Sequence, residues 1–240
     1  MFYEEKFKIG LKDIGKENRV KNKAILEMLE NIGAFQSDII GYGINDVLKN
    51  KVTWILLDWK LKIIDRPKYD QEIKIKTWAR YANKFFTYRD YELYVDSKLV
   101  AIATSKWALV NVETGKMAGI SQKVLDAYQV EEKHVFEEKN MDKIKAPDNY
   151  ESSIKYTVIR KDIDVNKHLH NLYYLDLAYE ALPEEVYEQE RPFDNVRIMY
   201  KKEVKLGDQV ECQYTKQGQK HIVTIKNKDN TKIHSVIELY

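Results

Sequence analysis

Residues 7–14, Phe-Lys-Ile-Gly-Leu-Lys-Asp-Ile, and residues 156–163, Tyr-Thr-Val-Ile-Arg-Lys-Asp-Ile, share one pattern. In each, an alternating segment leads into Lys-Asp-Ile, and an asparagine stands eight residues after the isoleucine, as Asn22 and Asn171. Self-similarity of this kind indicates a duplicated structural unit. Chance similarity between two α+β halves is the alternative, because short matches arise easily.

A helical pattern follows each copy. Apolar residues recur at i, i+3, i+4 and i+7, the spacing that places side chains on one buried face of a helix. These residues are Ile25, Met28, Leu29 and Ile32 in the first copy, and Leu175, Ala178, Tyr179 and Leu182 in the second. We therefore predict one core helix in each half of the chain.

Alternating segments fill most of the remaining sequence, as is typical of half-buried antiparallel strands. They include 52–64, 72–77, 85–95, 99–112 and 210–215. Asp96-Ser97-Lys98 and Thr114-Gly115 are expected to be turns. The fold class predicted is α+β, with two tandem domains, each an antiparallel sheet wrapped around a long central helix. We expect the domains at 1–128 and 150–240, joined by a charge-rich connector at 129–149.

Composition excludes several classes of protein. The chain has 240 residues, and its 40 basic and 38 acidic residues give a net charge of +2, whereas a nucleic-acid-binding protein usually has a strong basic excess. A single cysteine, Cys212, excludes an intrachain disulfide and a multi-cysteine metal site, and fits a reducing compartment. No apolar run approaches the roughly 20 residues of a membrane span. With no apolar signal core at the N-terminus, we expect a cytoplasmic protein without a metal or cofactor.

Residues 162–171, Asp-Ile-Asp-Val-Asn-Lys-His-Leu-His-Asn, carry the polar groups best suited to chemistry. Asp164, Asn166 and His168 occupy alternate positions, and an extended backbone would point all three side chains to one face. A polar loop with a helix N-cap is the alternative reading. The trio occurs once, since the first copy has Gly15, Glu17 and Arg19 in its place. We infer that one half carries the chemistry while the other shapes a pocket.

The same stretch, continued through Leu-Tyr-Tyr174, resembles the signature of acyl-acyl carrier protein (acyl-ACP) thioesterases. Residues 65–78 and Tyr200-Lys-Lys-Glu203 resemble further segments of that family, so the likeness runs along most of the chain. The resemblance implies a double hotdog fold, hydrolysis of fatty acyl thioesters of acyl carrier protein, and functional residues at Asp164, Asn166, His168 and Glu203. Many relatives place a cysteine after the glutamate, where this chain has Val204, which argues against a cysteine nucleophile.

The chemistry of thioester hydrolysis suggests a role for each residue. We expect Glu203, partly buried with its pKa raised, to act as general base on a water molecule. His168 would hydrogen-bond the water or carbonyl or protonate the leaving thiolate, Asn166 would orient water or substrate, and Asp164 would fix the histidine. Free N–H groups at the helix start near His170 and Asn171, the expected substrate-binding residues, would polarise the carbonyl.

Two other functions compete with this one: an acyl-coenzyme A thioesterase, and a non-catalytic acyl-binding hotdog module. We expect acyl carrier protein as partner, and a homodimer is also compatible with the sequence. Because carrier proteins are acidic, the docking surface should be basic. The candidates are Lys201, Lys202, Lys205 and Arg160-Lys161. The first copy, with apolar residues in its helix and in 52–64, is expected to line the acyl pocket.

Overall fold

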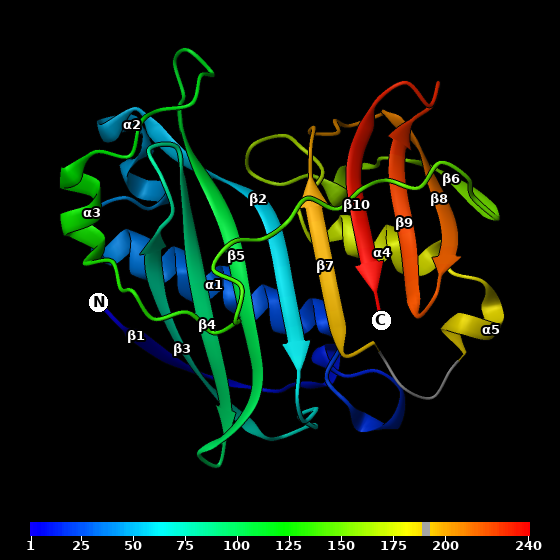
Figure 1. Ribbon diagram of the computed structural model, residues 1–240, viewed down its shortest axis with the longest axis horizontal. Coiled ribbons are helices and arrows are strands. Elements are labelled where there is room, and N and C mark those ends of the chain that lie inside the picture. The colour runs from blue at the N-terminus through cyan, green and yellow to red at the C-terminus, as the bar shows by residue number, and fades with distance from the viewer. Residues whose placement is uncertain (189–192) are drawn as a thin grey trace. The chain divides into compact units, whose positions relative to one another are not determined.

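The computed structural model describes residues 1–188 and 193–240 (Figure 1). The chain forms two compact units, Met1–Met141 and Asp142–Tyr240. The segment expected to connect the domains is divided between them. In the first unit, the Trp78 indole donates a hydrogen bond to the Lys133 carbonyl (2.7 Å), and in the second the Arg197 guanidinium donates to the Asp142 carbonyl (2.9 Å).

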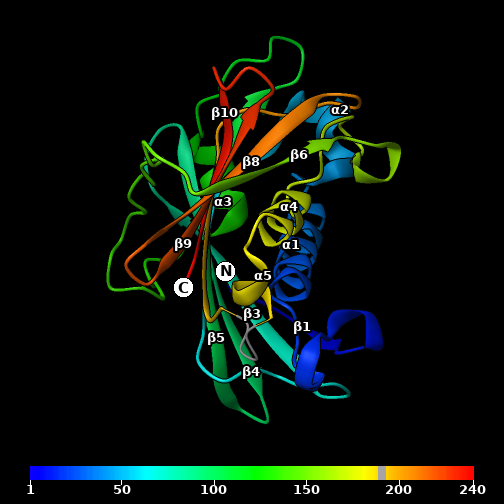
Figure 2. The ribbon, with the colours of Figure 1, turned by 90° about the vertical axis from the view of Figure 1, so that its right-hand side faces the viewer.

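The first unit is an antiparallel sheet with the strand order β1-β3-β4-β5-β2 and one long helix. Figure 2 shows the helix, α1, along one face of these strands. The elements are β1 (Tyr3–Lys8), α1 (Asn22–Ile39), α2 (Val47–Asn50), β2 (Val52–Ile63), β3 (Glu72–Tyr81), β4 (Phe86–Val95), β5 (Lys98–Asn111) and α3 (Gln122–Tyr128).

Hydrophobic burial holds α1 on the sheet. The predicted stripe is confirmed, because Ile25, Leu29 and Ile32 are fully buried and Met28 is 7% exposed. Each such side chain contributes about 1.5–3 kcal/mol when it leaves water. The β4–β5 turn also lies where the sequence predicts it, with positive φ angles at Asp96 and Ser97.

The second unit repeats the plan, with strand order β7-β10-β9-β8-β6. Its core helix α4 has 8 residues, compared with 18 in α1. Leu182 is buried but lies beyond the helix, because Pro183 disfavours helical backbone at the residue before it. The elements are β6 (Ser152–Thr157), α4 (Tyr173–Glu180), α5 (Glu184–Tyr187), β7 (Asn195–Tyr200), β8 (Gln209–Gln217), β9 (Lys220–Asn227) and β10 (Ile233–Leu239).

The repeated Lys-Asp-Ile segments fold alike. In each, the aspartate is buried in a one-turn 3₁₀ helix, and its carboxylate accepts the backbone N–H three residues earlier. The distances are 2.8 Å from Gly10 to Asp13 and 2.9 Å from Ile159 to Asp162. The isoleucine of each segment then forms an antiparallel bridge, Ile14 to Val20 and Ile163 to Leu169. The α+β prediction is therefore confirmed. The two units have the same strand order and the same turn before the core helix.

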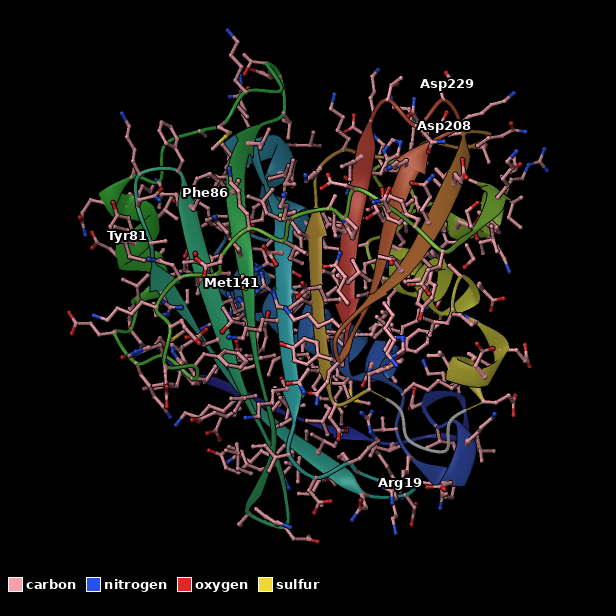
Figure 3. All side chains as sticks on the ribbon, turned by 45° about the vertical axis from the view of Figure 1, so that its right-hand side comes forward. Arg19, Tyr81, Phe86, Met141, Asp208 and Asp229 are labelled. Atoms are coloured by element: carbon pink, nitrogen blue, oxygen red, sulfur yellow. The ribbon has the colours of Figure 1, made fainter. Side chains whose placement is uncertain are left out.

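The Asp162 carboxylate gives the first prediction. It also accepts the Tyr156 hydroxyl at 2.7 Å, so Asp162→Ala leaves two donors without their partner. We expect the free energy of unfolding, measured by urea denaturation, to fall by about 1–3 kcal/mol. Asp229→Ala, at the exposed β9–β10 turn (Figure 3), is the control and should change it little. Equal stabilities of the two variants would contradict this account.

Cys212 gives the second prediction. Its thiol is fully buried on β8, and burial, with a smaller effect of Glu211, raises its pKa to about 12. Only the thiolate reacts readily with alkylating agents. We expect iodoacetamide at pH 8 to leave Cys212 unmodified in the folded protein and to alkylate it in urea, as measured by mass spectrometry. Rapid alkylation of the folded protein would show that β8 opens.

Candidate functional site

The segment from Asp162 to His170 is a closed loop between β6 and α4. Ile163 and Leu169 pair across it, and the Asp164 N–H donates to the His168 carbonyl at 2.8 Å. The Lys167 N–H returns to the Asp164 carbonyl at 3.0 Å, and Lys167 has a φ of 65°. The chain therefore reverses direction between Asp164 and His168.

The extended conformation expected for Asp164, Asn166 and His168 is wrong. One oxygen of the Asp164 carboxylate accepts the backbone N–H groups of Asn166 (2.8 Å) and His168 (3.1 Å), which stabilises a turn instead of a strand. As a result, Asn166 is exposed at the turn, whereas Asp164 and His168 are half-buried at its base. The turn thus brings Asp164 and His168 together by closing the loop.

The loop is joined to the segment that carries Glu203. The Leu169 N–H donates to the Val204 carbonyl at 2.8 Å, and His168 lies opposite Lys205 in an antiparallel bridge. Leu169 and Val204 are buried, so the alternation of side chains turns their neighbours to the other side. In the register of this bridge, Glu203 lies two residues before the residue opposite His168.

Glu203 is exposed, which corrects the expectation of a partly buried carboxylate. The segment from Lys201 to Val204 follows β7 without regular secondary structure. Asp208, labelled in Figure 3, accepts the Lys205 N–H at 2.9 Å and closes the turn after it.

The Tyr174 hydroxyl is influenced by the charges of both carboxylates. Burial raises the pKa of Tyr174 well above its usual range, and the charges of Glu203 and Asp164 raise it further. Both carboxylates therefore lie within electrostatic reach of one phenol on the first turn of α4. Tyr174 lies three residues after the 162–171 stretch, but a tyrosine in a helix gave no sequence signal for a role in the site.

His170 and Asn171 lie where the loop enters α4. The His170 Nδ1 accepts the Leu172 N–H at 3.2 Å and its carbonyl accepts the Tyr173 N–H at 2.9 Å. These two N–H groups at the start of the helix are therefore engaged within the loop, whereas polarisation of a substrate carbonyl by other N–H groups near His170 and Asn171 stays a prediction. The Asn171 carbonyl accepts the Tyr200 hydroxyl at 2.9 Å, which anchors the end of β7 to this loop.

The first unit has the same loop with different side chains. The Val20 N–H donates to the Pro67 carbonyl at 3.0 Å, and Arg19, labelled in Figure 3, pairs with Lys68. This hydrogen bond makes Arg66 the counterpart of Glu203. The Arg66 guanidinium is buried and donates to the Val20 carbonyl (3.0 Å) and to Asn22 Oδ1 (2.8 Å). In the first unit this position therefore stabilises the fold, whereas in the second unit it carries an exposed carboxylate.

In the described parts of the chain, no group of three or more His, Cys, Asp or Glu side chains could hold a metal ion. Nor does any described helix have the length and hydropathy needed to cross a membrane.

Several proteins of known sequence resemble the chain. An oleoyl-acyl carrier protein thioesterase of Arabidopsis thaliana, named as chloroplastic, is 24% identical over 87% of this chain and 62% of its own length. A second from Coriandrum sativum is 23% identical over 87% of this chain and 61% of its own length. The chain thus spans about three-fifths of these relatives.

Solved structures share the fold. An acyl-ACP thioesterase from Bacteroides thetaiotaomicron matches with a TM-score of 0.85 at 20% identity, covering 99% of this chain and 96% of that one. The 12:0-ACP thioesterase from Umbellularia californica matches with a TM-score of 0.86 at 15% identity, with the same coverage. The fold of this chain is therefore of the hotdog type expected from its sequence.

Two family models match the chain one after the other, and the gap between them includes the boundary between the two units. Residues 1–128 match the acyl-ACP thioesterase N-terminal domain, and residues 145–238 match the acyl-ACP thioesterase C-terminal domain. With most of its length accounted for by these two domains, the chain belongs to the acyl-ACP thioesterase family.

Proposed function

We propose that this protein hydrolyses the thioester of a fatty acyl-acyl carrier protein and releases the free fatty acid. The observation that carries the proposal is the backbone pairing of the His168 loop with the Glu203 segment. From it we infer that an imidazole and a carboxylate share one side of the pairing. Membership of the family supplies the class of substrate.

In the proposed reaction, Glu203 takes a proton from a water molecule as the water oxygen bonds to the thioester carbon. The carbonyl π-electrons move to oxygen, and His168 donates a hydrogen bond to the oxyanion or to the departing sulfur. When the tetrahedral intermediate collapses, the C–S bond breaks, and the proton taken up by Glu203 passes to the thiolate, directly or through His168. The products are a carboxylic acid and the free phosphopantetheine thiol.

Asp164 and Asn166 have different roles in this proposal. One Asp164 oxygen is committed to the N–H groups of Asn166 and His168, so we assign this residue to holding the turn and its histidine backbone. Asn166 is exposed at the turn, and its amide can both donate to and accept from a water molecule or the substrate. His170, whose Nδ1 is bonded to the Leu172 backbone, and Asn171 would contact the pantetheine arm.

The acyl chain needs an apolar space, and we propose that α1 and β2 of the first unit provide its walls. Most of their apolar side chains form the core, including Ile25 and Leu29 of α1 and Trp59 and Leu61 of β2. Replacing one of these side chains by a longer or shorter one would therefore change the length of acyl chain accepted and would also lower the stability of the protein.

We further propose that the carrier protein docks on the basic surface beside Glu203. Its members are exposed, and in the described part of the chain none of its four lysines forms an ion pair with a carboxylate. Two exposed apolar residues, Val165 and Leu206, lie on the adjacent turns. The basic residues are Arg160, Lys161, Lys201, Lys202 and Lys205.

The mechanism is tested by His168→Ala and Glu203→Gln. We expect each to lower kcat for acyl-ACP by about 10²–10⁴-fold, as general acid–base groups do when removed. The measurement is release of free thiol, detected with a chromogenic disulfide. Glu180→Gln, at the exposed end of α4, is the matched control and should retain full activity. Full turnover in both site variants would exclude this mechanism.

The same assay separates the competing functions. Comparable or faster hydrolysis of acyl-coenzyme A at equal concentration would favour an acyl-coenzyme A thioesterase. Acyl-chain binding without thiol release, by the unaltered protein, would favour a non-catalytic module.

The docking surface is tested by Lys202→Glu combined with Lys205→Glu. We expect KM for acyl-ACP to rise by about tenfold and to become less sensitive to salt, because attraction between exposed charges is screened. The double change Lys155→Glu with Lys216→Glu, on β6 and β8, is the control. KM for a short acyl-pantetheine thioester should be unchanged in both. A KM for acyl-ACP unaffected by charge reversal and by salt would contradict the assignment.

A further inference from the structure

The backbone before Glu203 is held by two side chains from other elements. The Lys202 carbonyl oxygen lies 3.5 Å from the Tyr174 hydroxyl of α4 and 3.2 Å from the Nδ1 of His234 on β10. A carbonyl oxygen only accepts hydrogen bonds, so both side chains act as donors, and Nδ1 is the protonated nitrogen of this imidazole. His234 is 8% exposed and Tyr174 is 3% exposed, so neither is a freely moving surface residue.

The backbone after Glu203 is held by the loop between β6 and α4. The Val204 carbonyl accepts the Leu169 N–H at 2.8 Å, which holds the peptide after Glu203 against that loop. The Lys201 and Lys202 N–H groups also donate to the His234 carbonyl, at 2.8 and 3.3 Å. Tyr174 and His234 therefore hold the main chain before an exposed carboxylate, and Leu169 holds it after.

The first unit provides an internal comparison. Tyr174 stands three residues after Asn171, and the residue three positions after the corresponding Asn22 is Ile25, which is fully buried. Ile25 has no hydroxyl, and Arg66 occupies the position of Glu203 in that unit. The phenol hydroxyl therefore occurs in the copy that carries the glutamate and is absent from the copy that does not.

We propose that Tyr174 and His234 are positioning residues for Glu203, setting the direction in which its carboxylate leaves the main chain. This inference rests on the proposed function, in which Glu203 is the general base. The segment from Lys201 to Val204 has no regular secondary structure, and the bond from the Leu169 N–H reaches only the residue after Glu203, so the peptide before Glu203 needs a separate constraint. The bonds to Tyr174 and His234 supply that constraint, and a catalytic group displaced by about 1 Å loses much of its effect.

The first test is Tyr174→Phe, which removes the hydroxyl and keeps the ring that packs edge-to-face on Tyr200. We expect kcat for acyl-ACP to fall by about tenfold or more while KM changes by less than about twofold, because substrate binding does not depend on the direction of Glu203. Tyr214→Phe is the matched control. It removes another buried phenol hydroxyl of this unit, one bonded to His221, and should retain kcat.

The second test compares two changes at His234. The amide nitrogen of asparagine can take the position of Nδ1, so His234→Asn should keep the bond to Lys202 and most of kcat. His234→Ala removes the donor, and we expect a loss similar to that in Tyr174→Phe. Thermal unfolding of each variant shows whether a loss of kcat follows a loss of fold.

A double-mutant cycle provides the third test. Glu203→Asp already displaces the carboxylate, so combining it with Tyr174→Phe should cost less than the product of the two single losses. Full kcat in both Tyr174→Phe and His234→Ala, or strictly multiplicative losses in the cycle, would overturn the inference and leave the proposed function standing. Full kcat in Glu203→Gln would instead remove the general base, and the inference with it.

Discussion

One backbone hydrogen bond, from the Leu169 N–H to the Val204 carbonyl, joins the two segments on which the proposed site depends. Without it, the loop that carries His168 and the irregular segment that carries Glu203 would have no fixed register. Because Leu169 and Val204 are both buried, breaking this bond would also leave polar groups without partners inside the unit. Packing and hydrogen bonding therefore maintain one arrangement, in which the residues on either side point away from the core.

The first unit shows that this arrangement is a property of the fold and not of the chemistry. It has the corresponding bond, from Val20 to Pro67, with Arg66 in place of the glutamate. A buried guanidinium must have acceptors, and Arg66 finds them in the Val20 carbonyl and Asn22. One backbone plan thus accommodates a structural side chain in one copy and an exposed carboxylate in the other.

The sequence predicted the features that depend on local periodicity. The stripe of Ile25, Leu29 and Ile32 identified α1, since burial of one helix face follows directly from residue spacing. The conformation of the 164–168 loop was missed, because the Asp164 carboxylate bonds to its own backbone and this overrides the alternation of side chains. The role of His234 had no local signal either. It depends on β10 reaching the end of β7, a contact between residues far apart in the sequence.

The exposure of Glu203 has a physical consequence for a general base. A buried carboxylate gains basicity from desolvation but loses easy access to water, whereas an exposed one meets water freely and must be directed by its main chain. In this protein that direction comes from backbone bonds formed when the unit folds, so the entropy of ordering the segment is lost before any substrate binds. During the reaction, only the side-chain rotations of Glu203 still have to be restricted. Rigid backbone on both sides of an exposed acid can thus provide the preorganisation that burial provides elsewhere.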